Sequence, residues 1–275
     1  MADPAVVTWG TFAIAVIGVA QPHVYNLWRR CFYARAIDVY ESYAPDIGFG
    51  PLGPVVGAAG TLKNCNAPSL IKQMTLRVTP ADGGEGRTLT ALLARERKIS
   101  NDGGGREVIE GKAWAAFEAE RDAAYQYDVL FADTDVRTKL EAIGRTFHTQ
   151  WIAYAIANVP GQPLTPEQQA VRAVELFNQA KNQAFYTAAR DAALREVFWR
   201  AGDFRLTIEI RCAEDTRTFA HSWDVTLTDD DVNAITANID ILLGLTAEIP
   251  PQALGQLAYA YPVYRPVAGP TVLTA

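Results

Sequence analysis

Apolar residues along the chain follow three different patterns. The first 30 residues contain a nearly unbroken apolar run, and several stretches between residues 36 and 131 alternate between apolar and polar positions, as do residues 205–227. Residues 133–200 instead repeat every three or four positions. Alternation is typical of half-buried strands, and a period near 3.6 is typical of amphipathic helices. The pattern therefore predicts a strand-rich domain interrupted by helices and preceded by an apolar segment.

Two pairs of alternating stretches predict β-hairpins. Residues 70–79 and 88–95 are joined by a glycine-rich connection, and residues 205–212 and 219–227 by a polar turn. Further strands are expected at residues 36–43, 55–59 and 125–131. We therefore predict the α+β class, with an antiparallel β-sandwich of about seven or eight strands and a two-helix insert. One N-terminal helix, which we expect to be transmembrane, precedes the sandwich.

The helical period predicts two helices inserted in the chain between strands of the sandwich and one helix after its last strand. The first has an apolar stripe formed by Val136, Leu140, Ile143, Phe147, Trp151 and Tyr154. Thr165 and Gln168 form a capping box for the second helix, which we expect to extend to Arg200. Thr228 caps the last helix, and Gly244 is expected to end it.

These elements divide the chain into five parts. They are the apolar helix (1–30), the first part of the sandwich (31–132), the helical hairpin insert (133–202), the last β-hairpin with the closing helix (203–245), and a tail rich in proline and tyrosine (246–275). Proline disfavours helix, so the tail is expected to be extended. It either packs back on the domain or presents Tyr259, Tyr261 and Tyr264 to a partner.

The apolar segment has the length and flanks of a single membrane span. Its 23 residues, 6–28, carry no acidic or basic side chain other than a histidine, and a helix needs roughly 20 residues to cross a bilayer core. Arg29, Arg30 and Arg35 follow, which favours an outer N-terminus and a cytoplasmic main domain at a bacterial inner membrane. The residues expected to contact the lipid bilayer are Val6, Trp9, Phe12, Ile14, Val16, Ile17, Val19, Val24, Tyr25, Leu27 and Trp28.

Two other interpretations of this segment stay open. Gly18-Val19-Ala20 resembles a signal-peptidase site, although no positive charge precedes the apolar core. Pro22 would kink a helix, so the segment also suits a buried or oligomer-forming helix. Small residues such as Gly10 and Gly18 allow close helix approach, which is the basis of a second functional hypothesis: a homo-oligomeric membrane assembly or membrane-perturbing effector.

Composition and motifs argue against several classes of function. The 275 residues carry a net charge of −6, which argues against nucleic-acid binding, and the three cysteines have neither disulfide nor zinc spacing. No cofactor is expected, because prolines interrupt the glycine motif at residues 48–53 where a dinucleotide site needs amide donors. An enzyme with an unfamiliar site at His221 and Asp224 is the third hypothesis, although a hydrogen-bonded core histidine is the simpler explanation.

The first half of the chain resembles a group of uncharacterised bacterial proteins. The segments that carry the resemblance are Ile17-Gly18-Val19-Ala20, Tyr25-Asn26-Leu27-Trp28-Arg29-Arg30, Gly53-Pro54-Val55-Val56-Gly57-Ala58-Ala59-Gly60-Thr61-Leu62 and Met74-Thr75-Leu76-Arg77-Val78. The resemblance implies one N-terminal membrane span followed by a cytoplasmic β-sandwich, and it implies no activity. The leading hypothesis is therefore a membrane-anchored, non-enzymatic binding or scaffold module for a cytoplasmic protein partner.

We expect the apolar segment to retain the full-length protein in the membrane pellet during alkaline carbonate extraction, because a spanning helix resists removal of peripheral contacts. A version that begins at Arg35 is expected in the supernatant. Immunoblots of the two fractions provide the measurement. Release of both forms would instead indicate a buried or oligomer-forming helix.

Overall fold

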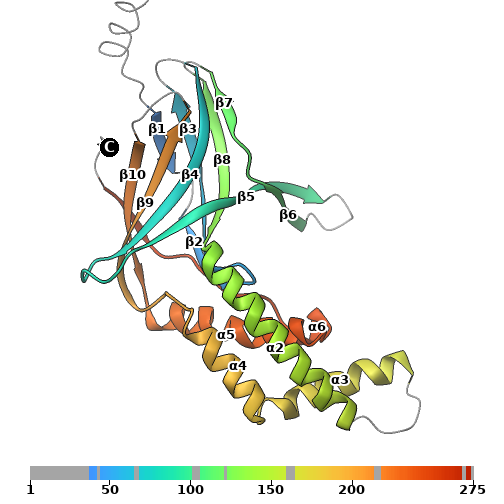
Figure 1. Ribbon diagram of the computed structural model, residues 1–275. Helices are drawn as coiled ribbons and strands as arrows, with labels where there is room; N and C mark the ends of the chain where they lie inside the picture. Colours follow the sequence, from blue (N-terminus) through green and yellow to red (C-terminus); the bar gives the residue numbers. More distant parts are fainter. Residues whose placement is uncertain are drawn as a thin grey trace, which may run out of the picture.

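The computed structural model describes residues 37–41, 44–64, 68–100, 106–120, 123–158, 165–213, 218–267 and 271–273. They form a curled antiparallel sheet with a group of helices at one end (Figure 1). This arrangement confirms the α+β class. The apolar segment at residues 6–28 lies outside these ranges, and no helix within them is long and apolar enough to cross a membrane.

Thirteen strands form one continuous sheet in the described part of the chain. In chain order they are β1 (Ile37–Glu41), β2 (Asp46–Gly50), β3 (Gly53–Asn64), β4 (Ser69–Pro80), β5 (Arg87–Ser100), β6 (Arg106–Ala113), β7 (Phe117–Ala119), β8 (Ala124–Ala132), β9 (Gly202–Cys212), β10 (Thr218–Leu227), β11 (Tyr259–Ala260), β12 (Tyr264–Pro266) and β13 (Thr271–Leu273). The main order is β11-β2-β3-β8-β5-β4-β9-β10-β12. Hydrogen bonds thus join these strands into a single curled sheet, where the sequence predicts the two layers of a sandwich.

Along β4 and β9 the sheet has an apolar inner face and a more polar outer face. In the pairing of β4 with β9, Leu76 lies opposite Ile208, and both side chains are fully buried. The next pair, Arg77 and Thr207, points to the other face. Each large apolar side chain buried in this way contributes about 1.5–3 kcal/mol, so the inner face supplies much of the driving force for folding. Both predicted hairpins, β4–β5 and β9–β10, are present.

An ion cluster ties three strands together on the sheet. The Arg95 guanidinium of β5 donates to Asp46 of β2 and to Asp128 of β8, with N–O distances of 2.5 Å in each ion pair. Burial alone would lower the pKa of Arg95, but the two carboxylates raise it above its ordinary value. The cluster lies over Gly57, where a Cβ atom would overlap the Asp46 and Arg95 side chains.

The tail joins the two edges of the sheet. β11 pairs with β2 at one end of the ladder, and β12 pairs with β10 at the other. Only residues 261–263 separate these two strands, and an extended chain spans at most about 3.6 Å per residue, so Ala260 and Tyr264 lie within about 14 Å of each other. The tail therefore packs back on the domain and links its opposite edges.

Five helices gather at one end of the curled sheet (Figure 1). They are α2 (Thr134–Asn158), α3 (Pro166–Ala180), α4 (Ala184–Leu194), α5 (Asp229–Thr246) and α6 (Pro251–Leu254). The predicted capping boxes are present: Thr165 exchanges hydrogen bonds with Gln168 at the start of α3, and Thr228 does so with Asp231 at the start of α5.

The helical insert contains three helices, where the sequence predicts two. A turn at residues 181–183 ends α3, and Gln183 has an extended backbone, with φ −93° and ψ 148°. This turn rotates α4 so that Tyr186, Ala189 and Ala193 face the core. No proline or glycine marks the turn, so the sequence pattern could not show it.

Asn238 joins α5 to the sheet and to the tail. Its side chain is 1% exposed, and its Nδ2 donates to the carbonyls of Phe49 in β2 and Ala258 before β11, at 2.9 and 2.8 Å. Its Oδ1 accepts a hydrogen bond from the Ala258 amide at 2.7 Å. One buried amide therefore fixes α5, β2 and the start of the tail relative to one another.

We expect Asn238→Leu to lower the free energy of unfolding by about 2–4 kcal/mol, because the buried groups of Phe49 and Ala258 would lose their partner. Chemical denaturation of the full chain measures the change. Asn233→Leu is the matched control, since Asn233 is an exposed residue on the same helix. Equal losses in the two variants would contradict the role assigned to Asn238.

Candidate functional site

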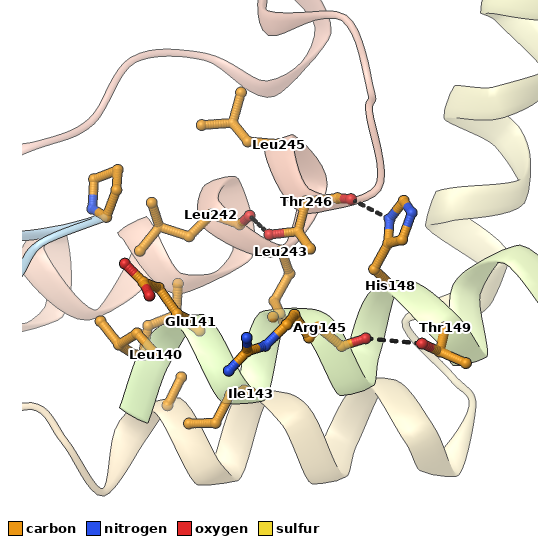
Figure 2. Close-up of a pocket in the computed structure, with 14 residues that line it drawn as sticks. Leu140, Glu141, Ile143, Arg145, His148, Thr149, Leu242, Leu243, Leu245 and Thr246 are labelled. Carbon is orange, nitrogen blue, oxygen red and sulfur yellow. Dashed lines mark hydrogen bonds between the residues drawn. The ribbon is translucent and has the colours of Figure 1, made fainter. Parts of the chain in front are cut away.

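A groove of about 800 Å³ lies between α2 and α5 (Figure 2). This volume falls within the range of about 300–1,000 Å³ that is typical of binding sites. Its apolar lining comes mainly from Leu140, Ile143, Ile239, Leu242, Leu243 and Leu245. Most of the wall of this groove is apolar.

The apolar stripe of α2 is buried near both ends and open in the middle. Val136 and Phe147 are fully buried, whereas Leu140 and Ile143 are only half-buried. Phe147 packs against Phe185 and Tyr186 of α4, with ring centroids 5.8 and 5.9 Å apart, so α4 covers this part of α2. The sequence predicts one apolar stripe on this helix, and the structure shows that the middle of the stripe lines the groove.

The opposite wall of the groove shows the same mixture of burial and exposure. Ile239 and Leu243 of α5 are buried, Leu242 is half-buried, and Leu245 is 40% exposed. Apolar side chains of two helices therefore meet solvent along one line. A helix surface of this kind normally packs against a neighbouring element.

His148 connects the two walls. Its Nδ1–H donates to the Thr246 carbonyl at 2.8 Å, because a carbonyl oxygen can only accept. This bond uses one of the carbonyls left open at the end of α5. In the neutral imidazole, Nε2 is then left as an acceptor, and His148 lines the groove (Figure 2).

The rim of the groove on α2 carries two charged residues. Glu141 accepts a hydrogen bond from Arg137, one turn earlier, at 2.9 Å. Arg145 is exposed, and its guanidinium has no hydrogen-bond or ion-pair partner among the residues that the structure describes. The rim therefore presents one paired carboxylate and one guanidinium that is available to a ligand.

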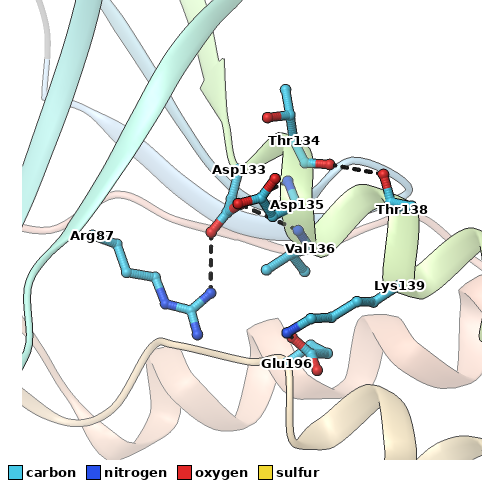
Figure 3. A network of polar contacts seen from close by, with 8 residues as sticks. All are labelled: Arg87, Asp133, Thr134, Asp135, Val136, Thr138, Lys139 and Glu196. Atoms are coloured by element: carbon cyan, nitrogen blue, oxygen red, sulfur yellow. Dashed lines mark hydrogen bonds and ion pairs between the residues drawn. The ribbon is translucent and has the colours of Figure 1, made fainter.

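The start of α2 is anchored by charged groups from the sheet and from the segment after α4 (Figure 3). Asp133 Oδ1 accepts hydrogen bonds from the amides of Asp135 and Val136, at 3.0 and 3.2 Å, and therefore caps the helix. Its other oxygen accepts from Arg87 of β5 at 3.1 Å. Lys139 pairs with Glu196 at 3.0 Å. These contacts set the position of the groove wall that follows.

The other wall is anchored by contacts between α4 and α5. The Tyr186 hydroxyl and the Arg190 Nε–H both donate to Asp240 Oδ1, at 2.9 and 3.1 Å. Burial and then the Asp240 carboxylate raise the pKa of Tyr186 well above its ordinary value. Tyr186 therefore stays protonated and continues to donate this hydrogen bond throughout the physiological pH range.

The end of α5 differs from the prediction that Gly244 stops the helix. Gly244 lies inside the helix, where a Cβ atom would overlap the Leu254 side chain of α6, so glycine permits the close approach of α6. The helix continues instead to Thr246, and Glu248, just beyond the C-cap residue Ala247, has φ of 58°. The Ile249 amide donates to the Gly244 carbonyl and the Glu248 amide to the Leu245 carbonyl, both at 3.0 Å, which is the Schellman pattern.

The residues predicted as functional from the sequence lie elsewhere. The predicted membrane-span residues, together with Arg29, Arg30 and Arg35, lie outside the described ranges. In the tail, Tyr259 packs against Gly48, and burial and the Asp46 carboxylate raise its pKa. Tyr264 is half-buried in β12, and Tyr261 is 70% exposed. Of the three tyrosines, Tyr261 is thus the one presented most openly to a partner.

The pair His221 and Asp224 is not assembled into a site. The two residues lie three positions apart on β10, so their side chains point to opposite faces of the sheet. Asp224 accepts two hydrogen bonds from Arg205, at 2.8 and 3.1 Å, and the Arg205 hydrogen bond lowers the pKa of Asp224. No group of three potential metal-ligating side chains occurs within the described ranges.

Comparisons with known proteins found no matching family model, no matching curated protein and no matching solved structure. The α2–α5 groove is therefore the feature of the molecule from which a function can be proposed.

We expect Glu248→Gly to raise the free energy of unfolding by roughly 0.5–1 kcal/mol, because glycine adopts the left-handed conformation without the strain of a Cβ atom. Chemical denaturation measures the gain. Glu248→Ala is the control: it removes the same charge but keeps the Cβ atom, and it should give no gain. Equal stabilisation by alanine would show that charge, rather than backbone strain, is responsible.

Proposed function

We propose that the protein is a non-enzymatic binding module that holds the apolar side of a partner helix in the α2–α5 groove. The observation that carries this proposal is the open middle of the α2 stripe, where Leu140 and Ile143 line the groove together with Leu242 and Leu245 of α5. Burial of apolar surface contributes roughly 25 cal/mol per Å². A third helix laid along the groove would therefore gain affinity from surface that the domain itself leaves uncovered.

The dimensions of the groove favour a helix over a compact small molecule. Its α2 wall extends from Leu140 to Thr149, which corresponds to about 14 Å along the helix axis. This length matches two to three turns of a partner helix with anchor residues at positions i, i+3 or i+4, and i+7. A small ligand is usually enclosed over most of its surface, whereas the α5 wall meets solvent at the half-buried Leu242 and the exposed Leu245.

We further propose that the N-terminal segment tethers the module to the bacterial inner membrane. The described chain begins at Ile37, which pairs with Asn64 at one end of β3. Gly53, at the other end of β3, lies against Val136 at the start of α2. The 12 residues of β3 span roughly 36 Å, so the groove lies at the end of the domain that is remote from the proposed tether. Such a module would present its groove to the cytoplasm.

A photo-reactive residue placed at Leu245 in the full-length protein tests the proposed function. We expect a covalent adduct with a protein in cells, and we expect Leu242→Asp to abolish it, because a carboxylate in the apolar wall opposes burial. Gel mobility and mass spectrometry identify the adduct.

Leu70 is the matched control position, because it is a leucine of similar exposure, 37% against 40%, on a strand outside the groove. Adducts at both positions, or at neither, would contradict a binding function of the groove. An adduct between two copies of this chain would instead support the homo-oligomeric assembly.

A further inference from the structure

We infer that the partner helix carries a carboxylate that pairs with Arg145 beside its apolar stripe. This inference rests on the proposed function of the groove. Glu141 and Arg145 are the charged residues among those that line the groove. Since Arg137 already pairs with Glu141, the charge left for a partner is the positive charge of Arg145.

Two further charged residues close to the groove, Lys139 and Asp240, are already engaged. Lys139, one turn before the groove, pairs with Glu196, and Asp240 on α5 accepts hydrogen bonds from Tyr186 and Arg190. The Arg145 guanidinium has no such partner in the part of the chain that the structure describes. A cation at the edge of an apolar groove therefore gives the site a preference for a ligand with a negatively charged group.

A carboxylate fits this position better than a neutral polar group. The guanidinium has five donors in a planar fork, which matches the two oxygens of aspartate or glutamate. A helix seated in the groove would exclude water from the nearby Leu140 and Ile143 on the same helix, and the lower local dielectric would strengthen the pair. A lysine at the same place on the partner would face Arg145 with like charge.

The position of Arg145 along α2 sets where the acidic residue must lie. Arg145 follows Ile143 by two residues and Leu140 by five, or about 3 and 7.5 Å along the helix axis. The carboxylate is therefore expected within one turn of the partner residue that contacts Ile143, at the flank of the apolar stripe.

The apolar N-terminal segment of this chain does not match that description. Residues 6–28 contain no aspartate or glutamate, so neither this segment nor the same segment of a second copy supplies the carboxylate. The geometry points instead to an acidic amphipathic helix of another protein.

Two synthetic helical peptides test the inference. Both have leucine anchors at i, i+3, i+4 and i+7; one has glutamates at the flanking positions and the other has lysines. Binding to the full-length protein, held in nanodiscs of neutral lipid, is measured by fluorescence anisotropy. We expect the glutamate peptide to bind about five- to tenfold more tightly, and we expect Arg145→Glu to reverse the preference.

Arg211→Glu is the matched control, because it makes the same charge change at an exposed residue of β9, outside the groove. This control should keep the preference for glutamate. If both peptides bind with equal affinity to the wild type and to Arg145→Glu, while Leu242→Asp abolishes binding, the groove function stands and the carboxylate inference is wrong. If neither peptide binds and dodecanoate binds through Arg145, the occupant is a small amphiphile and both proposals are overturned.

Discussion

The buried side chain of Asn238 is the contact on which the arrangement of this protein depends most directly. Its amide satisfies backbone groups of β2 and of the segment before β11, while its own helix, α5, forms one wall of the groove. The indole of Trp199 makes a second bond of this kind, to the Gly48 carbonyl at 2.8 Å. Because buried backbone groups must be paired, these two side chains define where α5 and the segment after α4 meet β2. Polar contacts, and not apolar packing alone, therefore determine the geometry of the groove.

The sequence predicts the local features of this fold well, because local features depend on neighbouring residues. The capping boxes at Thr165 and Thr228 and the alternation in β9 and β10 need no information from distant parts of the chain. The turn between α3 and α4 and the role of Gly244 were not predictable in this way. Both features depend on tertiary contacts. The break between α3 and α4 lets α4 bury one face, and glycine at position 244 leaves room for the side chain of Leu254.

The groove could not be predicted from the sequence, for a related reason. Leu140, Ile143 and Leu242 are recognisable as apolar stripe residues, but a stripe does not show which of its positions a neighbour leaves uncovered. The two walls lie about a hundred residues apart in the chain, and their pairing depends on Asp133, Tyr186 and His148. Arg145 looks like an ordinary exposed helix residue until these contacts place it at the rim.

The sheet places the start of the described chain and the helices at opposite ends of the molecule. The described chain begins at the Asn64 end of β3, and the helices lie at the Gly53 end, so a tether before Ile37 and a ligand in the groove would act at opposite ends of a stiff sheet. The ion cluster of Arg95 and the tail, which links β2 to β10, both resist relative movement of these strands. A rigid body of this kind would hold a helix bound in the proposed site at a fixed distance from the proposed tether. Spacing, rather than a change of shape, is therefore the property that the fold is best suited to provide.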